Sequence, residues 1–329
     1  MKLNKFFKFA KIFRHYRRGS KNLPYWPSRL WLEPTNRCNL RCTMCPNGID
    51  YDRLVRGDME GSLFRKIVDE AKDFVDDINL FHRGEPVLHP EIIQMVQYIH
   101  RQKVAVRLHT NATLLDEKMA PELIEAGLDY VSVSFDGYDK QTYEKIRRGA
   151  SFEKVLGNVI GLLKIKKEKK IKKPVVVLQL MDFSTAVSEE KEKLRQDFLS
   201  HFEKLPLDRF TIRIPHNWAG LLGEENPQKG KYSACLFPFY SLTILYDGVV
   251  LPCPQDFYGK LFIGSVKNHA LAEIWNGPQL KALRENLHRA VCPHPAPCDT
   301  CDVPYRKNFF GLTSGYLRTF LADRFKILK

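Results

Sequence analysis

Apolar, β-branched segments alternate with helix-like segments through the middle of the chain. The expected strands cover residues 30–35, 78–81, 104–109, 130–135, 175–181 and 210–214, and the expected helices cover residues 62–76, 91–102, 117–127, 152–167 and 188–202. Continuous apolar runs of this kind are typical of parallel strands buried on both faces. Six such units are fewer than the eight of a closed barrel. We therefore predict an α/β fold, a partial (β/α)6 barrel of parallel strands with its chemistry at their C-terminal ends.

The character of the sequence changes after Trp218, where prolines and glycines become frequent and five of the eight cysteines lie. A hairpin is expected around Asp247 and Gly248, because Asp-Gly between apolar runs favours a tight turn. Short helices are expected over residues 270–276 and 279–288. The predicted domains are a basic amphipathic segment (1–29), an α/β core (30–218), a small cysteine-rich domain that needs a metal (219–310) and a basic helix or tail (311–329).

Composition excludes several classes of protein. The 329 residues are 44% hydrophobic and 27% charged, as in ordinary globular domains. No run approaches the roughly 20 apolar residues of a membrane span, and no signal peptide is recognisable. Eight cysteines are too sparse for a disulfide scaffold, and their clustering indicates metal ligands in a reduced compartment. We therefore expect a cytoplasmic protein.

The formal net charge of +14 allows anionic partners without choosing among them. No phosphate loop or nucleic-acid motif is present, so no nucleic acid is expected as a partner. Residues 1–21 contain eight lysines and arginines and no acid, with Leu3, Phe6, Phe7, Ala10 and Phe13 at helical spacing. Two interpretations stay open, a helix lying on an anionic membrane surface and a helix packed against the rest of the protein.

Three cysteines, Cys38, Cys42 and Cys45, follow the first expected strand within eight residues. Structural zinc sites usually take four protein ligands. A 4Fe–4S cluster held by three cysteines leaves one iron open to a ligand that is not protein. A zinc loop with a distant fourth ligand remains the alternative.

This spacing resembles the signature of the radical S-adenosylmethionine (radical SAM) enzymes. The resemblance implies a 4Fe–4S cluster whose open iron is chelated by S-adenosylmethionine. It also implies reductive cleavage of that cofactor to a 5′-deoxyadenosyl radical, which abstracts a hydrogen from the substrate. A flavodoxin or ferredoxin is the reductant that the resemblance implies.

Polar residues at the ends of the next three strands add to the resemblance. Gly84 and Glu85 match a Gly-Gly-Glu-Pro motif that binds the amino group of S-adenosylmethionine, but Arg83 stands where that motif has its first glycine. Further matches are a Thr-Asn pair, a Ser-x-Asp-Gly strand and an Arg-Gly pair. The cofactor-binding residues expected by resemblance are Met44, Gly84, Glu85, Asn111, Ser134, Asp136 and Arg148.

The C-terminal cysteines resemble the auxiliary-cluster domain called SPASM, or twitch in its shortened form. The full form has seven cysteines for two clusters, and only five are present here. The resemblance implies one auxiliary 4Fe–4S cluster. Its expected ligands are Cys235, Cys253, Cys298 and Cys301. Cys292 is left over or replaces one of the four, and a zinc ribbon is the alternative.

The leading hypothesis is thus a radical SAM enzyme that oxidises or epimerises a small molecule. By resemblance the substrate is a sugar or cyclitol, and the basic charge suits a phosphorylated or lipid-linked one. A peptide-modifying maturase is an alternative, less favoured because only 29 residues precede the first strand and such enzymes often carry a leader-recognition domain. A non-enzymatic zinc-bearing adaptor for nucleic acid or membrane is the alternative of another class. No catalytic acid or base is assigned.

Overall fold

The computed structural model describes residues 2–182, 188–213, 215–222, 232–289, 294–306, 308–309 and 312–313. The chain divides into two compact units. The core unit comprises Leu32–Arg65 and Asp77–Pro215, and the auxiliary unit comprises Met1–Trp31, Lys66–Asp76 and His216–Lys329. The division at His216 lies near the expected boundary at residue 218, but the auxiliary unit also takes in the N-terminal segment. The helix expected over residues 311–329 lies almost wholly outside the described residues.

Parallel strands form the centre of the core unit. Neighbours are hydrogen-bonded in the order β2-β3-β4-β5-β6, and each neighbouring pair is parallel. The strand β1 (Arg29–Leu32) ends where the core unit begins, and the Phe81 amide donates to the Leu32 carbonyl at 3.0 Å. The strands are β2 (Asp77–Leu80), β3 (Ala105–Thr110), β4 (Tyr130–Ser134), β5 (Val175–Met181) and β6 (Arg209–Arg213). The mostly parallel sheet confirms the predicted α/β class.

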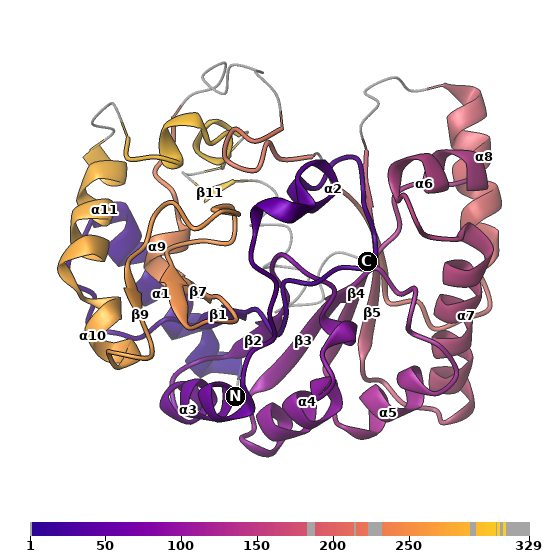
Figure 1. The fold of residues 1–329 in the computed structure, drawn as a ribbon, viewed down its shortest axis with the longest axis horizontal. Helices are drawn as coiled ribbons and strands as arrows, with labels where there is room; N and C mark the ends of the chain where they lie inside the picture. Colours follow the sequence, from indigo (N-terminus) through magenta and orange to yellow (C-terminus); the bar gives the residue numbers. More distant parts are fainter. Residues whose placement is uncertain are drawn as a thin grey trace. The chain divides into compact units, whose positions relative to one another are not determined.

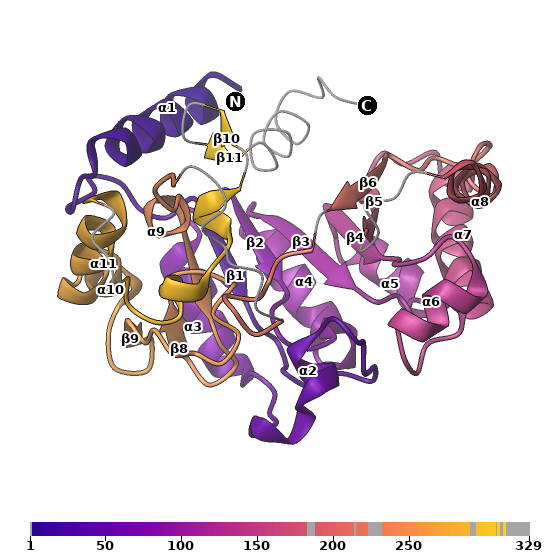
Figure 2. The same ribbon diagram turned by 90° about the horizontal axis from the view of Figure 1, so that it is seen from above.

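Helices cover one face of this sheet (Figures 1 and 2). The strand residues on that face are fully buried, as Leu108, Val131 and Leu178 show with 0% exposure. The helices of the core unit are α2 (Pro46–Ile49), α4 (Ile92–Arg101), α5 (Met119–Glu125), α6 (Lys140–Ile146), α7 (Phe152–Glu168) and α8 (Glu189–Ser200), and α3 (Gly61–Ala71) runs from this unit into the other. Helix α6 was not among the expected elements. Its N-cap residue is Asp139, whose side chain accepts a hydrogen bond from the Thr142 amide.

The other face of the sheet is polar. Along β3, buried side chains alternate with half-buried ones, among them Arg107 and His109. The parallel register places Ser132 of β4 opposite His109, and Gln179 of β5 opposite Ser134. Because side chains alternate between the faces of a strand, polar groups line this face as far as the carboxyl ends of the strands.

The auxiliary unit contains a small antiparallel sheet. Strands β7 (Ser241–Ile244) and β8 (Val249–Leu251) form the expected hairpin, and Gly248 has a φ of 87° in its turn. Strand β9 (Gly264–Ser265) pairs with β8, and β10 (Asn308–Phe309) pairs with β11 (Leu312–Thr313). The helices are α1 (Lys2–Arg18), α9 (Phe237–Tyr240), α10 (Leu271–Trp275) and α11 (Pro278–Arg289).

Buried Arg284 ties several of these elements together. Its guanidinium donates to the carbonyl oxygens of Pro238, Lys21 and Trp275 at 2.8–2.9 Å. These bonds satisfy a cation that is 0% exposed. None of the helices in the described part of the chain is long and apolar enough to cross a membrane.

Candidate functional site

The three cysteines that follow β1 lie close together in one loop, with Cys42 buried and Cys38 and Cys45 half-buried. Burial raises the pKa of the Cys38 thiol, and together with the nearby carboxylate of Glu85 and the thiolates of Cys42 and Cys45 it brings this pKa to about 12. Burial likewise raises the pKa of Cys45 to about 11. Mutually repelling, buried thiolates are the donor set that a positively charged metal centre stabilises. The residues present therefore fit a cluster ligated by three cysteines.

Backbone contacts fix this cysteine loop from two sides. The amides of Arg41 and Thr43 donate to the carbonyl oxygens of Arg148 and Ile146, both at 2.9 Å. The Arg41 guanidinium also donates to the carbonyl oxygens of Cys38 and Leu40. The loop is therefore held by the segment that follows α6.

Gly84 lies where the end of β2 meets the beginning of the cysteine loop. A Cβ at this position would lie 2.3 Å from the Thr35 carbonyl oxygen and 2.5 Å from that of Arg37. The next residue, Glu85, donates its amide to the same Arg37 oxygen at 2.8 Å. Both obstacles are backbone atoms, so only glycine fits here.

The carboxylate of Glu85 is buried at the end of β2, beside the end of β3. It accepts hydrogen bonds from the Thr110 hydroxyl at 2.6 Å and the Asn111 amide at 2.7 Å. Burial raises the pKa of Glu85 to about 7. The Asn111 side chain donates to Asn39 of the cysteine loop at 2.9 Å. The structure thus brings two of the expected cofactor residues, Glu85 and Asn111, together with the loop.

At the end of β4, Asp136 pairs with Arg147, with an oxygen-to-nitrogen distance of 2.5 Å. The Arg147 guanidinium also lies 3.9 Å from the Cys42 sulfur. Burial opposes its charge, but Asp136 and Cys42 together raise the pKa of Arg147, so the guanidinium stays protonated. Asp136 also accepts the Met181 amide at 2.7 Å. Sequence reasoning did not select Arg147.

The remaining expected cofactor residues occupy different surroundings. Ser134 is half-buried at the end of β4, and Met44 is half-buried in the cysteine loop. Arg148 is exposed, and its carbonyl is the group that holds Arg41. The Arg-Arg-Gly sequence does not show which of the two neighbouring arginines faces the cysteines. That depends on the direction of the chain after α6.

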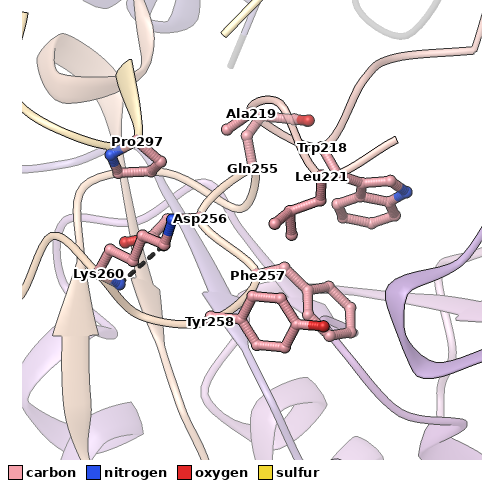
Figure 3. Close-up of a pocket in the computed structure, with 9 residues that line it drawn as sticks. All are labelled: Trp218, Ala219, Leu221, Gln255, Asp256, Phe257, Tyr258, Lys260 and Pro297. Atoms are coloured by element: carbon pink, nitrogen blue, oxygen red, sulfur yellow. Dashed lines mark hydrogen bonds between the residues drawn. The ribbon is translucent and has the colours of Figure 1, made fainter. Parts of the chain in front are cut away.

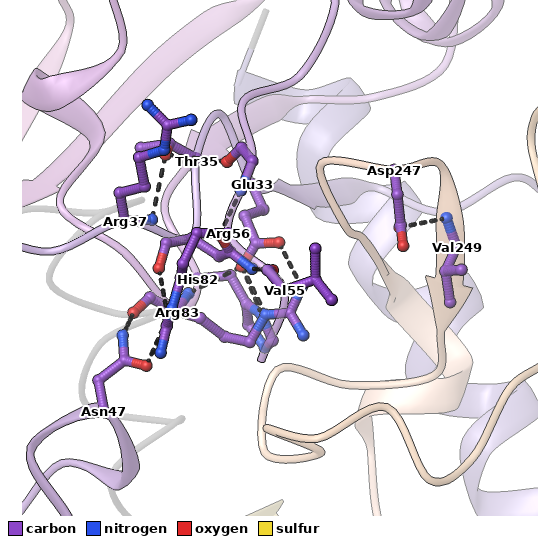
Figure 4. Close-up of polar contacts among 12 residues, drawn as sticks. Glu33, Thr35, Arg37, Asn47, Val55, Arg56, His82, Arg83, Asp247 and Val249 are labelled. Carbon is purple, nitrogen blue, oxygen red and sulfur yellow. Dashed lines mark hydrogen bonds and ion pairs between the residues drawn. The ribbon is translucent and has the colours of Figure 1, made fainter. Parts of the chain in front are cut away.

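A buried polar network joins the residues just after β1 to those just after β2 (Figure 4). Arg83 pairs with Glu33, and His82 lies 3.4 Å from the same carboxylate. Burial opposes the charge of Glu33, but Arg83 holds its pKa well below the usual range. The Asn47 side chain donates to the Arg83 carbonyl. Arg83 departs visibly from the motif in the sequence, whereas its partner Glu33 is marked there only as an acid within an apolar strand.

A second set of side-chain contacts, hydrogen bonds and stacked rings, holds the segment that follows the cysteines. The Arg56 guanidinium donates to the Asn36 carbonyl at 2.7 Å and the Asn47 side chain at 2.9 Å. The ring of Tyr51 lies between two guanidinium groups, with Arg41 at 3.4 Å and Arg56 at 3.7 Å from its centroid. Such stacking is favourable for arginine. This segment is thereby tied to both ends of the cysteine loop.

Four cysteines of the auxiliary unit also form a group. Burial raises the pKa of Cys235 to about 11 and that of Cys301 to about 12. The other three thiolates add to the burial that raises the pKa of Cys253. Burial also raises the pKa of Cys298, and the thiolates of Cys235 and Cys301 add to this effect. These are the four expected ligands, and Cys292 lies outside the described residues.

Aromatic side chains line a small pocket beside this second group (Figure 3). Its lining residues are Trp218, Ala219, Leu221, Gln255, Asp256, Phe257, Tyr258, Lys260 and Pro297. Trp218 and Ala219 both have left-handed backbone conformations, with φ of 47° and 51°. The Thr300 hydroxyl donates to the Ala219 carbonyl at 2.8 Å, which holds this turn against the segment that carries Cys298 and Cys301.

Within the described ranges, no three His, Cys, Asp or Glu side chains are arranged to hold a single metal ion. A mononuclear zinc site needs all of its ligands around one ion, whereas in a 4Fe–4S cluster each thiolate binds a different iron.

Comparison with known proteins agrees with the geometry. Residues 32–178 match the radical SAM superfamily, and residues 235–302 match the SPASM family, an iron–sulfur cluster-binding domain. A tungsten-containing aldehyde ferredoxin oxidoreductase cofactor-modifying protein from Pyrococcus furiosus is 32% identical, covering 83% of this chain and 88% of the relative. An S-adenosyl-L-methionine-dependent 2-deoxy-scyllo-inosamine dehydrogenase from Niallia circulans is 22% identical, covering 83% and 91%.

A likeness to solved structures supports the same fold. The structure of Streptococcus suis SuiB bound to precursor peptide SuiA has a TM-score of 0.65 and 15% identity, covering 89% of this chain and 73% of that one. The two matched domains imply a 4Fe–4S cluster that binds S-adenosylmethionine and an auxiliary iron–sulfur cluster.

Proposed function

The chain belongs to the radical SAM superfamily, and we propose on this premise that Cys38, Cys42 and Cys45 hold the cluster that binds S-adenosylmethionine. When bound and reduced, that cluster supplies the electron that cleaves S-adenosylmethionine, and the 5′-deoxyadenosyl radical so formed abstracts a hydrogen from the substrate. The grouping of these three thiols in one loop beside buried Glu85 carries the proposal.

The surrounding residues have distinct roles in this proposal. Glu85 accepts a hydrogen bond from the cofactor's amino group, and Thr110 and Asn111 orient its carboxylate. Gly84 lets the backbone of β2 approach the cysteine loop. Arg147 balances the negative charge of Cys42, and Asp136 holds Arg147 in place. Met44, Ser134 and Arg148 remain candidate contacts to the rest of the cofactor.

For the auxiliary cluster we propose Cys235, Cys253, Cys298 and Cys301 as ligands. Four thiolates occupy all four irons, so such a cluster carries electrons and leaves no iron open to substrate. Together the two clusters suit the net oxidation or epimerisation of a small molecule.

The proposed substrate is a hydroxylated, sugar-like or cyclitol-like molecule. The whole-length relative named as an inosamine dehydrogenase supports this class. The polar face of the sheet, where half-buried Gln179 of β5 lies opposite half-buried Ser134 of β4, offers hydrogen bonds to hydroxyl groups. A peptide substrate is the second candidate, favoured by the likeness to a structure that holds a precursor peptide.

Formation of 5′-deoxyadenosine tests the proposal. The protein, purified without oxygen and loaded with iron and sulfide, is reduced with dithionite or a flavodoxin and given S-adenosylmethionine. We expect about eight irons per chain and release of 5′-deoxyadenosine. The Cys38/Cys42/Cys45→Ala variant should keep about four irons and release none. Stoichiometric zinc without iron would contradict the enzyme and favour the adaptor.

The substrate class requires a second readout. Deuterated cyclitols, sugars and peptides are offered in turn, and transfer of deuterium into 5′-deoxyadenosine identifies the class that donates hydrogen. The Cys235/Cys253/Cys298/Cys301→Ala variant is the matched control. It should still accept deuterium but should lose net oxidation.

A further inference from the structure

Helix α1 has one side packed within the auxiliary unit and the other side exposed. Ile12 and Tyr16 are 5% and 3% exposed. The Tyr16 hydroxyl donates to the Ala234 carbonyl at 2.7 Å, and its ring lies 5.5 Å from that of Phe239, edge to face. These contacts fix which side of the helix faces outward, and they confirm the packed helix that the sequence left as one alternative.

The outward side combines aromatic and basic residues. Phe6 and Phe7 are 52% and 61% exposed. The exposed residues of α1 from Phe6 onward are Phe6, Phe7, Ala10, Lys11, Arg14, Arg17 and Arg18. At 3.6 residues per turn all but Lys11 fall within a sector of about 120° on the side opposite Ile12 and Tyr16. We call these six residues the outward face of α1.

No acidic side chain of α1 neutralises this face, because residues 1–21 contain none. Neighbouring acids of the auxiliary unit have other partners. Asp76 lies 3.5 Å from the Lys8 ammonium, and Glu285 pairs with Lys21 at 2.7 Å. The Lys11 ammonium group donates a hydrogen bond to the Pro24 carbonyl oxygen. The positive charge of the outward face therefore comes from its three arginines.

We propose that the outward face of α1 binds the surface of an anionic lipid bilayer. Phe6 and Phe7 lie at one end of the face and would enter the boundary between headgroups and acyl chains. The three arginines lie toward the other end of the face, which spans roughly 18 Å of helix in all, and would contact lipid phosphates, which guanidinium groups bind through paired hydrogen bonds. Exposed phenylalanines add nothing to contacts with the phosphates of duplex nucleic acid, whereas a lipid surface takes up both the aromatic rings and the arginines, so the pairing favours a lipid surface over a duplex.

Such attachment is peripheral and depends on ionic strength. Basic residues near an anionic surface contribute additively, and salt screens them. Losing three arginines should therefore weaken partitioning on the order of a hundredfold. The proposal goes beyond the reaction and does not rest on it, because the face lies on α1 and contains none of the proposed cluster ligands.

Vesicle sedimentation of the full-length, cluster-loaded protein tests this inference. Vesicles of phosphatidylcholine alone are compared with vesicles that also contain phosphatidylglycerol. The variants are Arg14/Arg17/Arg18→Gln and Phe6/Phe7→Ser. The matched control is Lys164/Lys167/Lys170→Gln, which removes the same charge from exposed positions at the end of α7. Iron content and circular dichroism confirm that each variant is folded.

We expect the parent protein and the α7 control to sediment with anionic vesicles and to stay in solution with neutral ones. Both α1 variants should remain largely in solution with either. Equal loss in the α7 control would show that net charge alone drives binding and would overturn the proposal. So would the absence of any sedimentation at low salt. A DNA oligonucleotide that binds the Phe6/Phe7→Ser variant as well as the parent, with no vesicle binding, would identify a polyanion site instead.

Discussion

Arg83 meets Glu33 through two parallel hydrogen bonds, Nε to Oε1 at 2.7 Å and Nη2 to Oε2 at 2.6 Å. Both side chains are buried, with exposures of 6% and 0%. The bidentate geometry is the strongest form of arginine–carboxylate contact. Arg83 stands where the resembling motif has glycine, and Glu33, just after β1, compensates for its charge. The arginine and the glutamate therefore neutralise each other inside the buried network, and the main-chain carbonyl of Arg83 accepts a hydrogen bond from the Asn47 side chain.

Breaking this pair should be costly. Arg83→Met leaves Glu33 charged and buried beside His82, so we expect a loss of about 3–5 kcal/mol in unfolding free energy. The double variant Glu33/Arg83→Met should recover most of that loss, because no isolated charge remains. Denaturant unfolding measures both. Arg37→Met is the control, since Arg37 is half-exposed beside Asp58 and should cost less than about 1 kcal/mol.

Gly84→Ala tests the close approach of β2 to the cysteine loop. Because the added carbon meets two backbone oxygens, the loop must shift, and we expect about 1–3 kcal/mol of destabilisation. Binding of S-adenosylmethionine should weaken as well. Gly161→Ala is the control, because nothing lies within 4 Å of its added carbon. In the middle of α7 that change should stabilise by about 0.5–1 kcal/mol. Equal effects at the two sites would contradict the close-approach argument.

Most of the strands were predictable because they are local apolar or β-branched runs, and β5 has the bounds expected from sequence. The short helix α6 was missed because its seven residues carry no sustained apolar period. The cysteine spacing and Gly84 are local features and could be read directly. The Glu33–Arg83 pair joins residues 50 positions apart, and only the three-dimensional arrangement of β1 and β2 brings them together.

The pH dependence of cofactor binding should report on Glu85. Its pKa is raised by burial to about 7, so the carboxyl is largely neutral at pH 6 and largely ionised at pH 8. The ionised form is the better acceptor for an amino group. We therefore expect the Kd for S-adenosylmethionine to fall by about tenfold between these values. Glu85→Gln should bind weakly and without this pH dependence, as calorimetry on the oxidised, cluster-loaded protein can show.

The raised pKa of Glu85 also makes the free energy of unfolding depend on pH. The folded pKa of about 7 lies above the value of 4.5 that is usual for a glutamate in water, so folding takes up a proton between these values. The contribution of Glu85 to stability should fall as pH rises from 4.5 to 7 and stay constant above. Glu85→Gln should remove this part of the pH profile. An unchanged profile would show that another group titrates there.

Arg147 should tune the reduction potential of the first cluster. Arg147→Met removes a buried positive charge 3.9 Å from the Cys42 sulfur, which makes adding an electron harder. We expect the potential to fall by on the order of 100 mV. Arg148→Met is the matched control, because it removes the same charge from an exposed neighbour where solvent screens the effect. Potentiometric titration followed by electron paramagnetic resonance measures both. Equal shifts would show that net charge, and not the contact with Cys42, sets the potential, whereas weaker binding of S-adenosylmethionine in Arg148→Met alone would assign the cofactor contact to Arg148.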